Sequence, residues 1–216
     1  MTTLIIAEHD GAALKGATLN TVAAAPGGGT YNVGFQVAPV GDNATNRAIL
    51  VTKSKADGSL DTSFGDGGRK VIDLVSTFHE SLTTNAGAKE QARAVTVDQL
   101  GRILLLGEIE GVQANATTAV DTDIFVARLH PNGNLDASYG TGGWSRVSFG
   151  DGVNPAGAPV VDYAGWDIAV RDDQKAVFTV GVGTDSAGTR TSRDIGVMQL
   201  RANGTPDPSF GDNGLV

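Results

Sequence analysis

The sequence contains no cysteine, so a disulfide framework, a thiol nucleophile and a thiolate metal site are all excluded. An excess of positive charge is also missing: 16 Lys and Arg stand against 24 Asp and Glu, a formal net charge of −8. This balance argues against a nucleic-acid partner and against attraction to an anionic membrane surface. No apolar run approaches the roughly 20 residues that a membrane helix needs, so we expect no membrane span.

The N-terminus has no lysine or arginine before its short apolar run, which reads MTTLIIAEHDG. That run is too short for a cleavable signal peptide. We therefore expect the protein either to remain cytoplasmic or to leave the cell by a route that needs no cleavable N-terminal signal.

Aromatic residues are scarce at 6%, whereas glycine occurs 30 times in 216 residues. With 40% apolar and 19% charged residues, the composition is that of a globular chain rather than a disordered one. Such a glycine-rich composition favours short strands and many turns, and the length allows a sizeable core.

One loop sequence occurs three times in the chain, and the three copies align without gaps. It reads ADGSLDTSFGDGG at residues 56–68, PNGNLDASYGTGG at 131–143 and ANGTPDPSFGDNG at 202–214. Each copy has Asp or Asn before Gly, an Asp four residues later, and then Ser, an aromatic residue and Gly. Because recurrence at a spacing of 75 and then 71 residues signals one repeated supersecondary unit, the chain predicts three similar units.

Three apolar segments recur around each loop. An apolar hairpin occupies residues 21–34, 94–107 and 168–181, and the three copies align without gaps. A third apolar strand lies at 48–55, 123–130 and 194–201, and a fourth follows the loop at 69–74 and 144–149. The pattern predicts an all-β, propeller-like fold of four-stranded antiparallel blades.

We expect a single repeat domain over residues 1–216, with blade one at about 18–74, blade two at about 92–149 and blade three at about 166–216. Two stretches, residues 12–25 and 80–93, are the best candidates for helices.

The hairpin, a strand like FVARL and the motif N/D-G-x-L-D-x-S-F/Y-G-x-G-G together resemble the delta-60 repeat family of bacterial propeller-like proteins. The resemblance covers nearly the whole chain. It implies a propeller-like fold and an extracellular or surface role, because members are mostly large, predicted secreted or surface proteins. It implies no particular activity.

Separately, residues 4–25 resemble the N-terminus of the electron-transfer flavoprotein alpha subunit, but nothing downstream resembles a flavin-binding domain, so we expect no redox role.

The recurring loops contain candidate calcium ligands. Their oxygen side chains alternate as in a calcium loop, and the candidates are Asp57, Asp61, Asp66, Asp136 and Asp207. However, the sharp-turn glycine of a calcium loop is missing, and copies two and three begin with Asn instead of Asp. The alternative is that Asp61, Asp136 and Asp207 accept backbone N–H bonds inside their own turns. We expect calcium to be a possible ligand and no other cofactor.

The aromatic residue of each loop is expected to be a buried plug between neighbouring blades. These residues are Phe64, Tyr139 and Phe210.

Catalytic patterns are missing: no H-x-x-x-H spacing and no G-x-S-x-G elbow occurs, so we expect no enzyme and no catalytic residue. The sequence predicts a non-catalytic structural or assembly protein, such as an extracellular matrix, surface or filament component. The alternative is a ligand-binding propeller, such as a calcium-dependent carbohydrate binder, or a propeller hydrolase.

The sequence also predicts self-association by strand exchange. The third copy of the loop is followed by two residues, whereas copies one and two are followed by a fourth strand. Residues 3–7, which read TLIIA, are apolar and have no blade of their own. We expect this strand to complete the third blade of another subunit, giving a dimer or a head-to-tail polymer. The expected assembly residues are Thr3, Leu4, Ile5, Ile6, Ala7, Leu215 and Val216.

Overall fold

The computed structural model describes residues 17–37, 47–74, 89–112, 120–147, 160–186, 189–190 and 194–216. These residues form β-strands, turns and loops, and none of them is helical. The helices considered from the sequence are therefore wrong where the structure describes them, because residues 17–25 form β1 and residues 89–93 lie in β5. Across the described ranges, no helix is long and apolar enough to cross a membrane.

The first repeat is a four-stranded antiparallel sheet. It contains β1 (Ala17–Ala25), β2 (Gly29–Val37), β3 (Arg47–Ser54) and β4 (Arg69–Ile72), each paired with the next. The second repeat has the same order, with β5 (Lys89–Val97), β6 (Ile103–Val112), β7 (Val120–Leu129) and β8 (Trp144–Val147). A single parallel pair, Arg47 with Lys89, links these two sheets.

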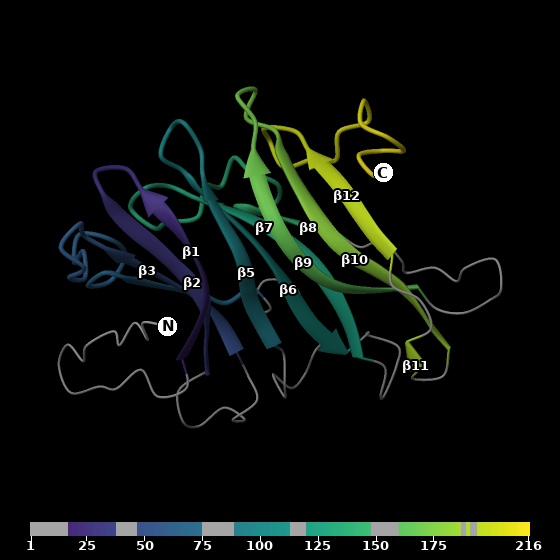
Figure 1. Cartoon of the computed structure of the whole chain (residues 1–216), viewed down its shortest axis with the longest axis horizontal. Helices are drawn as coiled ribbons and strands as arrows, with labels where there is room; N and C mark the ends of the chain where they lie inside the picture. Colours follow the sequence, from purple (N-terminus) through teal and green to yellow (C-terminus); the bar gives the residue numbers. More distant parts are fainter. Residues whose placement is uncertain are drawn as a thin grey trace.

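The third repeat contains β9 (Val160–Val170), β10 (Ala176–Ser186) and β12 (Asp194–Leu200), with the two-residue β11 (Thr189–Arg190) beside the end of β10. Leu215 and Val216 lie along β12 in the place that β4 and β8 occupy in the other repeats. The Val216 amide donates to the Val197 carbonyl at 2.9 Å, and the Val197 amide donates to the Val216 carbonyl at 2.8 Å. The three sheets follow one another across the molecule from β1 to β12 (Figure 1).

The first strands of the repeats stand next to one another. β5 contacts both β1 and β9, and the Asn20 side-chain amide on β1 donates to the Ala92 carbonyl on β5 at 2.8 Å. Neighbouring sheets that meet along their first strands are the arrangement of propeller blades. The described residues confirm an all-β fold of successive antiparallel sheets, which is compatible with a propeller-like architecture.

The third hairpin differs by one residue from its expected alignment. Without gaps, the sequence matches Ile103 with Val177. In the structure Ile103 pairs with Leu129 and Ala176 pairs with Leu200, so Ala176 is the true equivalent of Ile103. The gapless alignment of this hairpin is therefore wrong. The turn glycine of the second hairpin, Gly101 (φ +74°), then corresponds to Gln174 (φ +65°). The backbone of Gln174 thus has a positive φ, which residues other than glycine seldom adopt.

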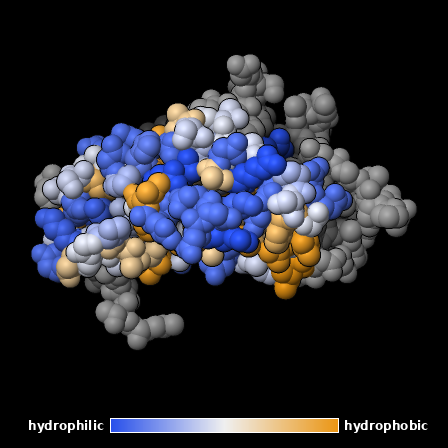
Figure 2. All heavy atoms as spheres, turned by 90° about the horizontal axis from the view of Figure 1, so that it is seen from above, coloured by the Kyte–Doolittle hydropathy of each residue, from blue (hydrophilic) through white to orange (hydrophobic). Residues whose placement is uncertain are grey.

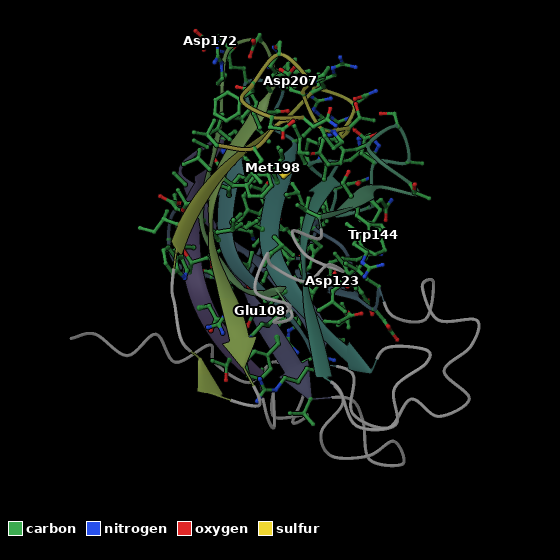
Figure 3. All side chains as sticks on the ribbon, turned by 90° about the vertical axis from the view of Figure 1, so that its right-hand side faces the viewer. Glu108, Asp123, Trp144, Asp172, Met198 and Asp207 are labelled. Atoms are coloured by element: carbon green, nitrogen blue, oxygen red, sulfur yellow. The ribbon has the colours of Figure 1, made fainter. Side chains whose placement is uncertain are left out.

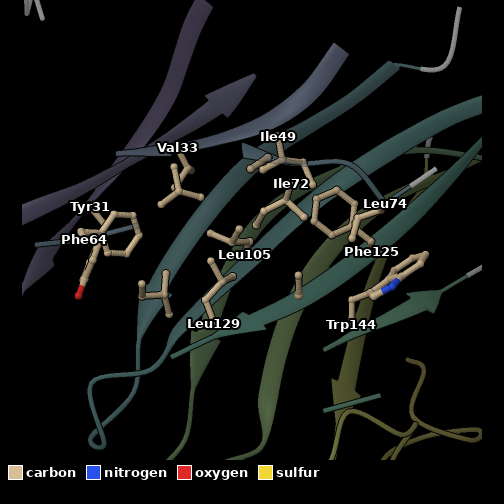
Figure 4. Close-up of a cluster of buried hydrophobic side chains, with 14 of the residues drawn as sticks. Tyr31, Val33, Ile49, Phe64, Ile72, Leu74, Leu105, Phe125, Leu129 and Trp144 are labelled. Carbon is tan, nitrogen blue, oxygen red and sulfur yellow. The ribbon is translucent and has the colours of Figure 1, made fainter. Parts of the chain in front are cut away.

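Two apolar clusters hold the repeats together. The first joins repeats one and two and includes Phe64, Leu105 and Phe125, as Figure 4 shows. The second joins repeats two and three and includes Ile124 and Phe178. Along β7, Phe125 belongs to the first cluster and Ile124 to the second, because successive strand residues point to opposite faces. The middle repeat is therefore buried on both faces.

Candidate functional site: the joints between repeats and the open face of the third repeat

Each recurring loop is closed by an aspartate and a serine. In the second copy, Oδ1 of Asp136 accepts hydrogen bonds from the backbone N–H of Ser138 at 3.1 Å and from its hydroxyl at 2.6 Å. The same pair of bonds links Asp61 with Ser63 and Asp207 with Ser209. The expectation that these aspartates serve their own turns is confirmed.

The other carboxylate oxygen of each of these aspartates meets a cation. Lys53 Nζ lies 2.9 Å from Asp61, Arg128 Nε 2.8 Å from Asp136, and Lys175 Nζ 2.8 Å from Asp207. Hydrogen bonds from Ser63 and Lys53 lower the pKa of Asp61 to about 2. Burial raises the pKa of Asp136, but hydrogen bonds from Ser138 and the charge of Arg128 outweigh it and hold that pKa at about 2. The pKa of Asp207 is likewise lowered, chiefly by Lys175 and Ser209.

These contacts bear on the calcium hypothesis. A calcium ion takes six to eight oxygen ligands, and carboxylates are its main source of charge. At the three loops a lysine or arginine already neutralises the Asp, and Oδ1 of Asp57 accepts from Ser59. Asp66 is exposed. Over the described part of the chain, no three acidic or histidine side chains group closely enough to hold a metal ion. In the structure Asp61, Asp136 and Asp207 are engaged in their own turns and in ion pairs, and calcium binding stays a prediction.

The aromatic residue of one loop covers the glycine turn of the next. The Phe64 ring is 1% exposed and lies against Gly133, where an added Cβ would stand 3.0 Å from the ring. Beside it, the Gly65 amide donates to the Asn132 carbonyl at 2.9 Å. We call this pair of contacts the inter-repeat joint.

The same joint recurs between repeats two and three. The Tyr139 ring is fully buried against Gly204, and the Gly140 amide donates to the Asn203 carbonyl at 2.7 Å. The predicted plugs Phe64 and Tyr139 are thus buried between sheets.

Arg128 strengthens the second joint, and sequence reasoning did not single it out. Its Nη1 donates to the Ala202 carbonyl of the next repeat at 2.6 Å, and its Cζ lies 4.5 Å from the centre of the Tyr139 ring. In each repeat, a long polar side chain stands eight residues before the loop aspartate that it contacts. The pairs are Lys53 with Asp61, Arg128 with Asp136 and Gln199 with Asp207. A long polar side chain at this constant spacing was the signal that could have identified the role.

The face of the third repeat that points away from the second differs from its counterparts. Ile49 and Ile124 occupy equivalent strand positions and are 0% exposed, because the following repeat covers them. Ile195, at the same position of β12, is 68% exposed. Phe210 is half-buried rather than buried, which corrects the prediction for the third plug: no described repeat supplies a glycine turn against it.

The predicted assembly residues fall into two groups. Leu215 and Val216 lie beside β12. Thr3, Leu4, Ile5, Ile6 and Ala7 lie outside the described residues. Seen from above, the coloured surface is largely hydrophilic, with hydrophobic patches left of centre and at the lower right of the view (Figure 2).

Two grooves lie at equivalent places along the joints. The one between repeats one and two measures about 860 Å³ and is lined by polar groups such as Asp66, Arg69 and Lys70. The one between repeats two and three measures about 640 Å³, and Trp144 and Pro206 line it. Because equivalent positions carry unrelated side chains, the grooves do not form a repeated ligand site. In Figure 3 Asp207 lies near one end of the sheets and Glu108 toward the other, so these carboxylates do not converge.

One protein family has a model that matches parts of the chain. It is described as "Domain of unknown function (DUF5122) beta-propeller", and it matches residues 101–139 and 180–210. Both segments run from the second strand of a repeat to the aromatic region of its loop. The similarity supports a propeller-like repeat protein. No curated protein matches the chain.

Proposed function

We propose that the chain is a non-catalytic structural module that assembles with copies of itself through the open face and edge of the third repeat. The observation that carries this proposal is Ile195, which is 68% exposed where Ile49 and Ile124 are fully buried. The loop motif that resembles delta-60 repeat proteins supports an extracellular or surface setting for such a module.

The backbone beside Ile195 supports the same proposal. Val197 exchanges both of its backbone hydrogen bonds with Val216 on the outer side of β12. In an antiparallel pair such bonds recur at every second residue, so the N–H and C=O of Ile195 face the same outer edge. Proteins normally cover a flat, apolar strand edge. A strand from a second copy, with residues 3–7 as our candidate, would cover it and give a closed dimer or an open filament.

A ligand-binding propeller or hydrolase is the competing proposal. It needs a convergent cluster of polar groups in one pocket. The two grooves have dissimilar linings, and the loop carboxylates are already paired with cations. Self-association is therefore the better-supported function.

Replacing Ile195 with Lys should weaken self-association while leaving the fold intact. Burying such a side chain contributes about 1.5–3 kcal/mol, which corresponds to about tenfold to a hundredfold in the dissociation constant. Sedimentation velocity over a range of micromolar concentrations measures this, and a thermal melt reports the fold.

Leu100→Lys is the matched control, because Leu100 is 66% exposed but lies in the hairpin turn of repeat two. Its mass in solution should equal that of the wild type. A wild-type protein that is monomeric throughout, or an equal effect of both substitutions, would contradict the proposed function.

A further inference from the structure

The inter-repeat joint has two complementary sides. One side, the donor side, is an aromatic ring followed by a glycine amide, as in Phe64 and Gly65. The other, the acceptor side, is an Asp-Gly or Asn-Gly turn that offers a carbonyl and a glycine on which the ring can pack, as in Asn132 and Gly133. The structure contains this joint twice, with amide-to-carbonyl distances of 2.9 and 2.7 Å.

One donor side and one acceptor side are not used within the described chain. Phe210 and Gly211 form the third donor side, and the Gly211 amide has no backbone acceptor among the described residues. Asp57 and Gly58 form the first acceptor side. A Cβ added at Gly58 would meet nothing within 4 Å, whereas at Gly133 and Gly204 it would meet an aromatic ring.

We propose that these two sides meet between two copies of the chain. The Phe210 ring of one copy packs on Gly58 of the next, and the Gly211 amide donates to the Asp57 carbonyl there. This head-to-tail contact rests on the proposed function and names the surface of the second copy that the open face binds. It is a continuation of a joint that the chain already builds twice.

Both unused sides already have the conformation of the joined ones. On the acceptor side Gly58, Gly133 and Gly204 have φ of +82°, +90° and +84°. Oδ1 of Asp57 accepts a hydrogen bond from the backbone amide two residues further along the chain at 2.9 Å. Oδ1 of Asn132, at the aligned position, accepts the same bond at 3.0 Å. Because the backbone does not need to rearrange, little free energy is lost on docking.

The donor side matches equally well. Gly65, Gly140 and Gly211 have φ of +53°, +55° and +54°, so the Gly211 amide follows Phe210 with the same backbone turn that brings the other two amides to their acceptors. The one difference in charge is on the acceptor side, where Asp57 stands in place of the neutral Asn132 and Asn203 of the in-chain joints.

The acceptor side is tested by Gly58→Asn. Asn tolerates positive φ, and no atom lies within 4 Å of a Cβ added at this position, so the fold should hold. The side chain would occupy the place of the incoming ring. Gly142→Asn is the control, since Gly142 has φ +65° and equally open surroundings but belongs to neither unused side. We expect Gly58→Asn to weaken association by about thirtyfold, the effect of losing an interface hot spot, and Gly142→Asn to leave it unchanged.

The donor side is tested by Phe210→Ala, which should weaken association to a similar extent. Mixing this variant with Gly58→Asn should then restore association, because one joint of the mixed pair keeps both native sides. Sedimentation of the labelled variants, alone and mixed, measures this. If wild type associates but Gly58→Asn associates as tightly, or the mixture stays monomeric, this joint is wrong and the proposed function stands. A monomeric wild type would overturn both.

Discussion

Phe64→Ala and Tyr139→Ala are each expected to destabilise the protein by about 3–5 kcal/mol, because truncating a buried aromatic ring leaves a cavity between two sheets. Both rings are essentially unexposed, and each lies against a glycine whose added Cβ would stand 3.0 Å away. Chemical denaturation with a fixed m-value measures the free energy of unfolding.

The third plug provides the internal comparison. Phe210 is half-buried, so Phe210→Ala should cost the isolated chain clearly less than either of the other two substitutions. Equal losses for all three, or melts of Phe64→Ala and Tyr139→Ala that match the wild type, would show that these loops are not plugs between repeats.

Asp136→Asn is expected to destabilise the protein by about 3 kcal/mol or more. The Arg128 and Asp136 side chains are 4% and 5% exposed, and losing one charge of a buried pair leaves the other uncompensated. Asp61→Asn is the matched variant: Lys53 and Asp61 are 20% and 16% exposed, and a better-solvated pair typically contributes about 1 kcal/mol or less. Similar losses at the two positions would contradict the burial argument.

The same aspartate makes stability depend on acid pH. The pKa of Asp136 is about 2 in the folded protein, against about 3.9 for an unperturbed Asp. Its stabilising contribution is therefore complete above about pH 4 and is lost as the pH falls through 2. Unfolding measured between these limits should show a shallower pH dependence for Asp136→Asn than for the wild type, and identical slopes would count against the assignment.

The repeated loop carried most of what the sequence could reveal. Three gapless copies were enough to predict the antiparallel sheets and the aspartate turns, because both depend on local residue pattern. The register of the third hairpin was not predictable in this way. Gln174 adopts the positive φ that Gly101 adopts in repeat two, and no residue type in the sequence marks that equivalence.

The candidate site was predictable only in part, because exposure depends on what lies beside a repeat. Ile49, Ile124 and Ile195 are the same residue in the same pattern, and the sequence cannot distinguish them. The structure does so, since a following sheet covers the first two and leaves the third 68% exposed. Likewise, Phe210 repeats the motif of Phe64, but no glycine turn among the described residues lies against it, and it is half-buried.

The central claim is that the third repeat is completed by another copy, and amide hydrogen exchange tests it most directly. The Gly65 and Gly140 amides donate within the chain at 2.9 and 2.7 Å, so they should be protected at every protein concentration. The Ile195 and Gly211 amides should be protected at concentrations where sedimentation shows association and should exchange rapidly when the protein is diluted to monomer. Rapid exchange of both amides in the associated protein, or protection that dilution leaves unchanged, would contradict the claim.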